Sequence, residues 1–148
     1  MADAATLPAL LAAGAGRYTH SEAVVEVSRR LTWAGLQQQV RGAAAALVAA
    51  GIEPGDTVAI WAPNSTEWIV AQLAVASAGA VLVPLNTRFQ GPEAGYVLRR
   101  SRARLLFTVG GFLGRDYRDL LDGEDLPHLG ATVLLEDEPL RRFLDSGT

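Results

Sequence analysis

The residue that most invites a chemical role is Arg88, which follows Pro84-Leu85-Asn86-Thr87 in the sequence. The apolar run from Val81 to Leu85 predicts a buried strand, so Arg88 lies just past the carboxyl end of that strand. Open α/β sheets bind ligands at this edge, and a guanidinium placed there can hold an anionic group. Position alone nevertheless favours an ordinary use of Arg88 in a surface salt bridge.

Asn64 occupies the equivalent place after another buried strand, Thr57 to Trp61. With Glu67 three residues later it forms a pattern typical of a helix N-terminus, in which the two side chains cap the first turn. This capping role explains Asn64 without a ligand.

Three glycines, Gly110, Gly111 and Gly114, follow a third predicted strand and invite a dinucleotide-binding interpretation. Their spacing is G-G-x-x-G rather than G-x-G-x-x-G, and no acidic residue about 20 positions later ends a second strand. Glycines at the end of a strand more often mark a loop, which is the favoured interpretation.

Metal-binding and nucleophilic sites find little support. His20 and His128 are far apart, and neither has another ligand at a metal-binding spacing, so both are predicted to be solvated loop residues. No G-x-S-x-G elbow occurs, and Ser77 is interpreted as a small residue that permits close helix packing. A cluster of acidic residues interspersed with Arg115 and Arg118 indicates a solvated helix surface. The cluster consists of Asp116, Asp119, Asp122, Glu124 and Asp125.

Composition excludes several classes of function. The 148 residues suffice for one domain, and a net charge of −3 gives no electrostatic reason to bind nucleic acid or anionic lipid. There is no cysteine, which excludes disulfides and thiolate chemistry. All 13 basic residues are arginine, so a Schiff-base lysine and a Walker-type ATP site are also excluded.

The chain is expected to be cytoplasmic. The first basic residue is Arg17, so the positive region that opens a secretory signal is missing. A weak alternative is a transmembrane span from Trp68 to Thr87, 20 residues without a charged side chain. Polar and helix-breaking residues within this stretch favour a buried helix leading into a buried strand.

Apolar periodicity alternates between the spacings of helices and strands, which is typical of an α/β fold. The predicted helices are Leu7 to Ala15, Trp33 to Ala50, Ser65 to Ala78, Pro92 to Arg100, Tyr117 to Leu121 and Pro139 to Leu144. The predicted strands are Glu22 to Val27, Arg30 to Trp33, Thr57 to Trp61, Val81 to Leu85, Arg104 to Val109 and Thr132 to Leu135. Gly51 is expected to end the second helix as a left-handed cap, and Tyr96 and Val97 are expected to face inward.

Three stretches together resemble the opening of the adenylate-forming enzyme superfamily. Leu31 to Leu36 (LTWAGL) is similar to its first motif, a strand running into a helix with a T-aromatic-x-x-L core. Ile52 to Asn64 (IEPGDTVAIWAPN) is similar to the G-D-x-V-A-I strand and the Pro-Asn that follows. Ala78 to Arg88 (AGAVLVPLNTR) is similar to the A-G-A-x-x-V-P-L-N segment of acyl-CoA synthetases. The order and spacing of these motifs make the combination specific.

Within the superfamily, Asn86-Thr87-Arg88 resembles fatty-acid and aryl-acid CoA ligases rather than peptide-synthetase adenylation domains, which usually carry an aspartate near this point. Leu105 to Gly114 (LLFTVGGFLG) resembles actinobacterial CoA ligases that act on the bicyclic propanoate left by sterol-ring degradation. The resemblance therefore implies an AMP-forming acyl-CoA synthetase of fatty-acid, lipid or steroid metabolism.

The resemblance implies a two-step reaction. A carboxylate attacks the α-phosphate of ATP to give an acyl-adenylate and pyrophosphate, and the CoA thiol then displaces AMP. The first step needs a phosphate cradle, Mg²⁺ and a cation. The superfamily takes these from a Ser/Thr/Gly-rich loop ending in Pro-Lys-Gly, a Thr-Glu pair and a lysine of the C-terminal lid domain. None of these is in the sequence, so the chain offers no catalytic residue or metal ligand, and alone it is expected to be inactive and to bind no cofactor tightly.

One site residue carries over. In related aryl-acid ligases the arginine of the N-x-R segment lies near the phosphates of CoA, and Arg88 matches that position. The resemblance thus implies a contact between Arg88 and a CoA phosphate, weak in the absence of the lid domain.

The resemblance also implies that residues 1–148 form the N-terminal portion of the AMP-binding domain, without its phosphate loop and lid. We expect an incomplete three-layer α/β unit with a mostly parallel, doubly wound sheet and flanking helices. An unfinished sheet edge should make the chain prone to self-association as a homo-oligomer. The alternative hypothesis is a non-catalytic scaffold or dimerisation module derived from the same fold.

Overall fold

The fold is built around β3 (Thr57–Trp61), a strand with four of its five residues buried. In the computed structural model, which describes residues 5–147, β3 lies between β4 (Val81–Pro84) and β5 (Leu105–Thr108). With β6 (Ala131–Leu134) at one edge, the order is β4-β3-β5-β6 and every pairing is parallel. The predicted mostly parallel sheet is confirmed, although the ends of the predicted unit lie outside the described residues.

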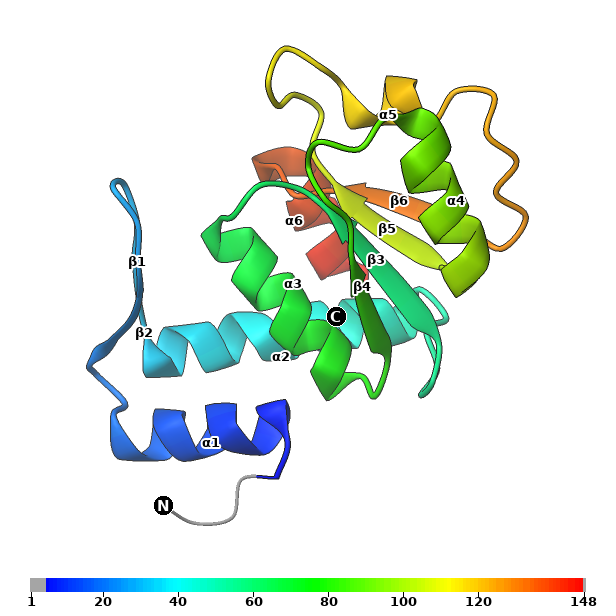
Figure 1. Cartoon of the computed structure of the whole chain (residues 1–148). Coiled ribbons are helices and arrows are strands. Elements are labelled where there is room, and N and C mark those ends of the chain that lie inside the picture. Colours follow the sequence, from blue (N-terminus) through cyan, green and yellow to red (C-terminus); the bar gives the residue numbers. More distant parts are fainter. Residues whose placement is uncertain (1–4, 148) are drawn as a thin grey trace.

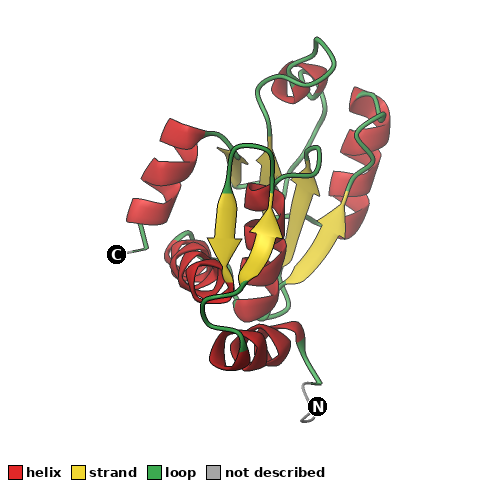
Figure 2. Cartoon of the chain, turned by 90° about the vertical axis from the view of Figure 1, so that its left-hand side faces the viewer, coloured by secondary structure: helices red, strands yellow, loops and turns green. Residues whose placement is uncertain are grey.

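Helices cover both faces of this sheet (Figures 1 and 2). They are α1 (Leu7–Arg17), α2 (Trp33–Ala49), α3 (Thr66–Ser77), α4 (Gly91–Ser101), α5 (Tyr117–Leu120) and α6 (Asp137–Asp145). Successive strand residues point to opposite faces, so Val58 and Ile60 pack with α2, α3 and α6, while Ala59 and Trp61 pack with α4 and α5. The result is the predicted three-layer, doubly wound arrangement.

The helix α2 follows its sequence pattern closely. Thr32 caps it, because its hydroxyl oxygen accepts a hydrogen bond from the amide of Gly35 at 3.1 Å. Its buried face consists of Leu36, Val40, Ala43, Ala46 and Leu47, which recur at the spacing of one helix face. Gly51 ends the helix with φ +83°, as predicted.

The start of α3 corrects one prediction. Ser65, not Asn64, is the N-cap, and its hydroxyl oxygen accepts from the amide of Trp68 at 3.1 Å. Both Asn64 and Ser65 are residue types that cap helices, and the Ser65 side chain is the one that does so here. At the other end, the exposed Ser77 hydroxyl donates to the carbonyl of Leu73 at 2.8 Å, so Ser77 does not mediate close helix packing either.

The strand β4 is not the buried strand expected from its sequence. It forms one edge of the sheet, and Val81 is 52% exposed. The amides of Val81 and Leu85 donate to carbonyls at the ends of β3, those of Asp56 and Ile60. Hydrogen-bonding directions alternate along a strand, so the backbone nitrogen of Pro84 points away from β3. Proline has no N–H to offer a further strand, which suits an edge position.

The helix α4 also differs from expectation in the face it buries. Tyr96 is 63% exposed and Val97 is half-buried, whereas Gly91, Ala94, Gly95 and Leu98 face inward. A Cβ at Gly91 would collide with the Leu120 carbonyl, and one at Gly95 would collide with the Glu124 carboxylate. Small residues therefore form the packing face, and the aromatic ring is displaced outward.

The two remaining strands form a hairpin. β1 (Glu22–Val25) and β2 (Arg30–Thr32) pair antiparallel and project beside α2 (Figure 1).

Residues 68–87, considered above as a possible membrane span, do not form one helix. They divide between α3, a turn, β4 and the start of the loop after it. Within residues 5–147, no helix has the length and apolar character needed to cross a membrane.

Candidate functional site

The site is the carboxyl edge of the sheet, where the loops after β3, β4 and β5 meet. The chain leaves β3 toward β4 on one side and leaves β5 toward β6 on the other, so the topology reverses between β3 and β5. The hydroxyl of Thr108 donates to the carbonyl of Trp61 at 2.9 Å and joins the two strands at this point. Doubly wound sheets bind ligands at such reversals.

Two buried aromatic side chains anchor the loop after β4. The indole N–H of Trp61 donates to the carbonyl of Asn86 at 3.0 Å, and the hydroxyl of Tyr117 donates to the carbonyl of Thr87 at 2.7 Å. The two rings stack with centroids 4.3 Å apart, and at 0% and 1% exposure neither ring meets solvent. Each ring fills the core and uses its polar atom to hold the loop backbone.

The side chain of Arg88 projects from this anchored loop. The Asn86 side-chain oxygen accepts from the Arg88 amide at 2.9 Å, which closes an Asx turn around Thr87. The guanidinium is exposed and makes no ion pair or hydrogen bond within the described part of the chain. The predicted surface salt bridge is therefore wrong, because no carboxylate of the described residues lies within reach, and the cation remains available.

Sequence reasoning missed Trp61 and Tyr117. Burial raises the pKa of the Tyr117 phenol above its usual range, an effect that the nearby positive charge of Arg115 partly opposes. The phenol thus stays protonated and keeps donating to the loop. A signal existed in the sequence, since Trp61 ends its strand and Tyr117 begins its helix, and each is an aromatic residue with a polar atom. Only the fold brings the two together.

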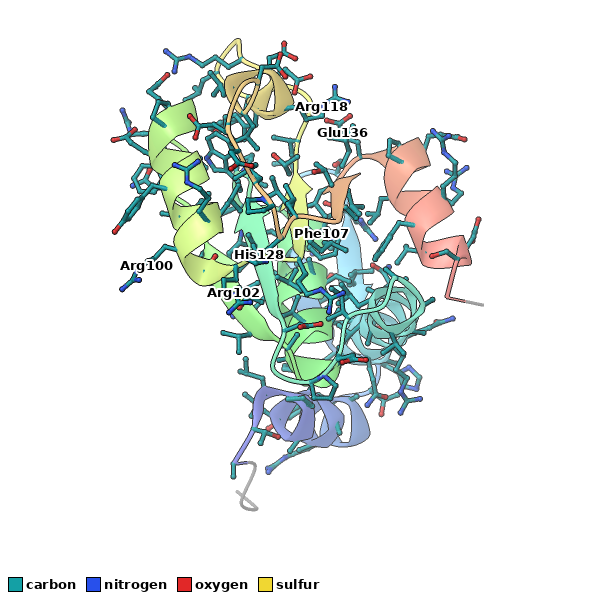
Figure 3. All side chains as sticks on the ribbon, turned by 90° about the vertical axis from the view of Figure 1, so that its right-hand side faces the viewer. Arg100, Arg102, Phe107, Arg118, His128 and Glu136 are labelled. Carbon is teal, nitrogen blue, oxygen red and sulfur yellow. The ribbon has the colours of Figure 1, made fainter. Side chains whose placement is uncertain are left out.

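The glycines after β5 do not form a nucleotide cradle. The amide of Gly110 donates to the Glu136 carboxylate at 2.5 Å, and Arg118 lies close by (Figure 3). Gly114 has φ +75° and belongs to a tight turn after Leu113, which has φ +54°. The Gly110 amide is thus already bound to an anion, so the favoured loop interpretation holds and the dinucleotide interpretation is wrong.

The acidic cluster proves more ordered than a solvated helix surface. Asp116 caps α5 and binds Arg118 through both carboxylate oxygens, at 3.0 and 2.5 Å, and the guanidinium lowers the pKa of Asp116. Glu124 binds Arg99 of α4 at 2.6 Å. These ion pairs position the segment after β5, and α5 ends at Leu120, before much of the cluster.

The other residues singled out from the sequence lie elsewhere. Asn64 is exposed beside a hollow of about 340 Å³ between the hairpin and the start of α3. His20 and His128 are both exposed, His20 in the turn after α1 and His128 in the loop before β6, as predicted. Among residues 5–147, no three acidic or histidine side chains gather as a metal site would require.

Residues 11–146 match the sequence model of the family described as "AMP-binding enzyme". The chain belongs to this family. It is 46% identical over 131 residues to 3-[(3aS,4S,7aS)-7a-methyl-1,5-dioxo-octahydro-1H-inden-4-yl]propanoyl:CoA ligase of Mycobacterium tuberculosis, which covers 88% of this chain and 26% of that protein. The ligase of the same name from Rhodococcus jostii is 42% identical over 126 residues, which covers 82% of this chain and 24% of that protein. This AMP-binding chain thus spans about a quarter of the length of these curated relatives.

Solved structures agree with the family. The N-terminal domain of FACL13 from Mycobacterium tuberculosis, in an inhibitor-bound crystal structure, aligns with a TM-score of 0.86 at 28% identity, covering 97% of this chain and 36% of that one. The anthranilate CoA ligase AuaEII in complex with anthranoyl-AMP aligns with a TM-score of 0.81 at 25% identity, covering 96% of this chain and 27% of that one. Enzymes of this AMP-binding family use ATP and CoA.

The carboxyl edge fits one phosphate group better than a triphosphate. Arg88 supplies a free guanidinium, which can bind a phosphate through two parallel N–H donors. A triphosphate needs several amides and cations together, yet the Gly110 amide is bound to Glu136 and the sequence has no lysine. The residues present therefore suit a single phosphate group better than a triphosphate.

Proposed function

We propose that this chain is the N-terminal portion of the adenylation domain of an acid–CoA ligase. The complete enzyme converts a carboxylic acid, ATP and CoA to acyl-CoA, AMP and pyrophosphate through an acyl-adenylate. The 46% identity over 131 residues to a CoA ligase carries this proposal. The carboxyl edge adds support, because it presents an unpaired cation at the place where sheets of this kind bind ligands.

For the carboxylic acid, we propose a bicyclic propanoate of the class named for the two most similar CoA ligases described above. Both are actinobacterial proteins, and their identity with this chain is 46% and 42%. The segment Leu105 to Gly114, which forms β5 and the loop after it, carries the same resemblance.

Within the complete enzyme, Arg88 contacts a phosphate of CoA. Its backbone is fixed by the Asn86 turn and by the Trp61 and Tyr117 anchors, so the guanidinium is presented from a rigid loop. A preorganised cation loses less entropy on binding than a mobile one. The cradle for ATP and its Mg²⁺ comes from other polypeptide, and the 148 residues alone are inactive.

A chimera tests the function directly. Residues 11–146 replace the matching region of the Mycobacterium tuberculosis ligase, and thioester formation is measured with the bicyclic propanoate, ATP and CoA. We expect activity to survive the exchange. In the chimera, Arg88→Ala should raise the KM for CoA about 10-fold or more, which corresponds to one lost charge-assisted contact, while the KM for the acid stays unchanged.

The matched control is Arg41→Ala, which removes another exposed arginine, on α2. It should leave the KM for CoA unchanged. A folded chimera that forms no thioester would contradict the proposed function, and equal effects of the two substitutions would contradict the role of Arg88.

The alternative of a non-catalytic scaffold or dimerisation module rests on the sheet edges. Both β4 and β6 lack an outer partner among residues 5–147. Pro84 obstructs β4, so self-association would proceed through β6. Sedimentation of the isolated chain distinguishes the cases, since a module gives one tight dimer and an unfinished edge gives weak, concentration-dependent association.

A further inference from the structure

A hollow lined by basic side chains lies at the amino edge of the sheet, opposite the carboxyl edge. It has a volume of about 430 Å³ and receives three basic side chains from two segments of the chain. Arg102 follows α4, and His128 belongs to the loop before β6 (Figure 3). Arg104 directly precedes β5. The remaining lining residues are Gly55, Asp56, Thr57 and Ser101.

The charges in this hollow do not cancel. Asp56 is its only carboxylate, and it forms an ion pair with Arg104 at 2.9 Å. The guanidinium of Arg102 has no hydrogen bond or ion pair within residues 5–147, and the side chain is exposed. One full positive charge is thus left over, beside the imidazole of His128.

The backbone at Arg102 is unusual by comparison with two other helix ends in the same chain. Gly51 after α2 and Gly79 after α3 have φ +83° and +75°. Each donates its amide to the carbonyl three residues back, and the next amide reaches the carbonyl five residues back. Arg102 makes the same pair of bonds, to Arg99 and from Ala103 to Leu98, with φ +56°. An arginine therefore occupies a position where the chain elsewhere uses glycine.

Capping does not explain this arginine. The carbonyls of Leu98 and Arg99 already accept backbone amides, and the Ser101 hydroxyl also donates to Leu98. A guanidinium is not needed to satisfy them. Because a left-handed backbone costs free energy in any residue with a Cβ, the strain at Arg102 points to a use for its side chain.

We propose that this hollow binds a phosphate group, either free phosphate or the terminal group of a small phosphate ester. Arg102 holds two of its oxygens through parallel N–H donors, and His128 faces it from the opposite segment. Arg104 contributes less, because Asp56 neutralises it. This site is separate from the carboxyl edge and does not depend on the proposed ligase function.

Isothermal titration of the 148-residue chain with inorganic phosphate, at constant ionic strength set with NaCl, tests the proposal. A parallel titration with glycerol phosphate distinguishes free phosphate from an ester. Arg102→Gly removes the guanidinium and also relieves the backbone. We expect it to weaken phosphate binding at least 10-fold while the Tm without phosphate stays equal or rises.

The matched control is Arg100→Ala, near the end of α4, with its side chain directed away from the hollow (Figure 3). It should leave phosphate binding unchanged. The proposal is overturned if the wild-type chain binds no phosphate, if Arg102→Gly binds it as well as the wild type, or if Arg100→Ala weakens it equally.

Discussion

The two edges of the parallel sheet present cations in different ways. At the carboxyl edge, Arg88 extends from an unstrained loop that two buried aromatic side chains hold by its carbonyls. At the amino edge, Arg102 sits in a left-handed conformation directly at a helix end. In the first case the surrounding core fixes the cation, and in the second the backbone of the residue itself does.

The difference has a thermodynamic consequence. The position of Arg88 at the carboxyl edge depends on two buried aromatic side chains, so removing either of them should destabilise the whole domain. The position of Arg102 at the amino edge depends on a strained backbone, so replacing this residue by glycine should relieve that strain. Substitutions at the two edges should therefore change the free energy of unfolding in opposite directions.

Loss of the Trp61 indole should have the largest effect. Trp61 is fully buried against Tyr117, so Trp61→Ala leaves a cavity and should lower the free energy of unfolding by about 3–5 kcal/mol. Trp61→Phe keeps most of the volume and should cost less. Urea unfolding measures both, and a loss below about 1 kcal/mol for alanine would show that the aromatic anchor is unimportant.

Substitutions at the ends of α3 and α4 should change the free energy of unfolding in opposite directions. At Gly79, φ is +75° and an added Cβ would approach the Pro54 Cβ to 3.3 Å, so Gly79→Ala should cost about 1–2 kcal/mol. Arg102→Gly should instead leave stability equal or raise it by about 0.5 kcal/mol. The comparison of edges fails if Arg102→Gly destabilises the chain in thermal unfolding.

The hydroxyl of Tyr117 should contribute a smaller, pH-dependent amount. Tyr117→Phe removes the bond to the Thr87 carbonyl and should cost about 1 kcal/mol. Because burial raises the pKa of Tyr117, its contribution is complete below the unfolded pKa of about 10 and is lost as pH rises through the folded pKa. The phenylalanine variant should show less alkaline destabilisation between pH 9 and 11 by circular dichroism.

The ion pair of Asp116 should matter least. Arg118 lowers the pKa of Asp116, so its contribution is present above the unfolded pKa of about 4 and is lost as pH falls through the lower folded value. Exposure to solvent limits the effect to under about 1 kcal/mol. Asp116→Asn should reduce the loss of stability between pH 5 and 3 relative to Asp122→Asn, an exposed control.

Much of the fold was readable from the sequence because apolar periodicity records which residues meet the core. The strand Thr57–Trp61 has its predicted bounds, and each of the other eleven elements lies within a few residues of its predicted place. The failures have specific causes. Val81 looks buried by composition, yet its strand is an edge, and Tyr96 is displaced by a packing face of small residues.

The site was less readable because it depends on contacts distant in sequence. Arg88 was identified from its neighbours, but its freedom from an ion pair follows only from the arrangement of the loops. Trp61 and Tyr117 are 56 positions apart, and no local pattern could pair them. The bond between Gly110 and Glu136, which decides against a nucleotide cradle, crosses 26 positions.

The most direct test of the account is ATP–pyrophosphate exchange by the purified 148-residue chain, with Mg²⁺ and the bicyclic propanoate supplied. Within residues 5–147, the carboxyl edge presents the unpaired guanidinium of Arg88, and the Gly110 amide there is bound to Glu136. We therefore predict exchange at the rate of the protein-free solution. Exchange above that rate, abolished by heating the chain, would show that these residues alone activate an acid.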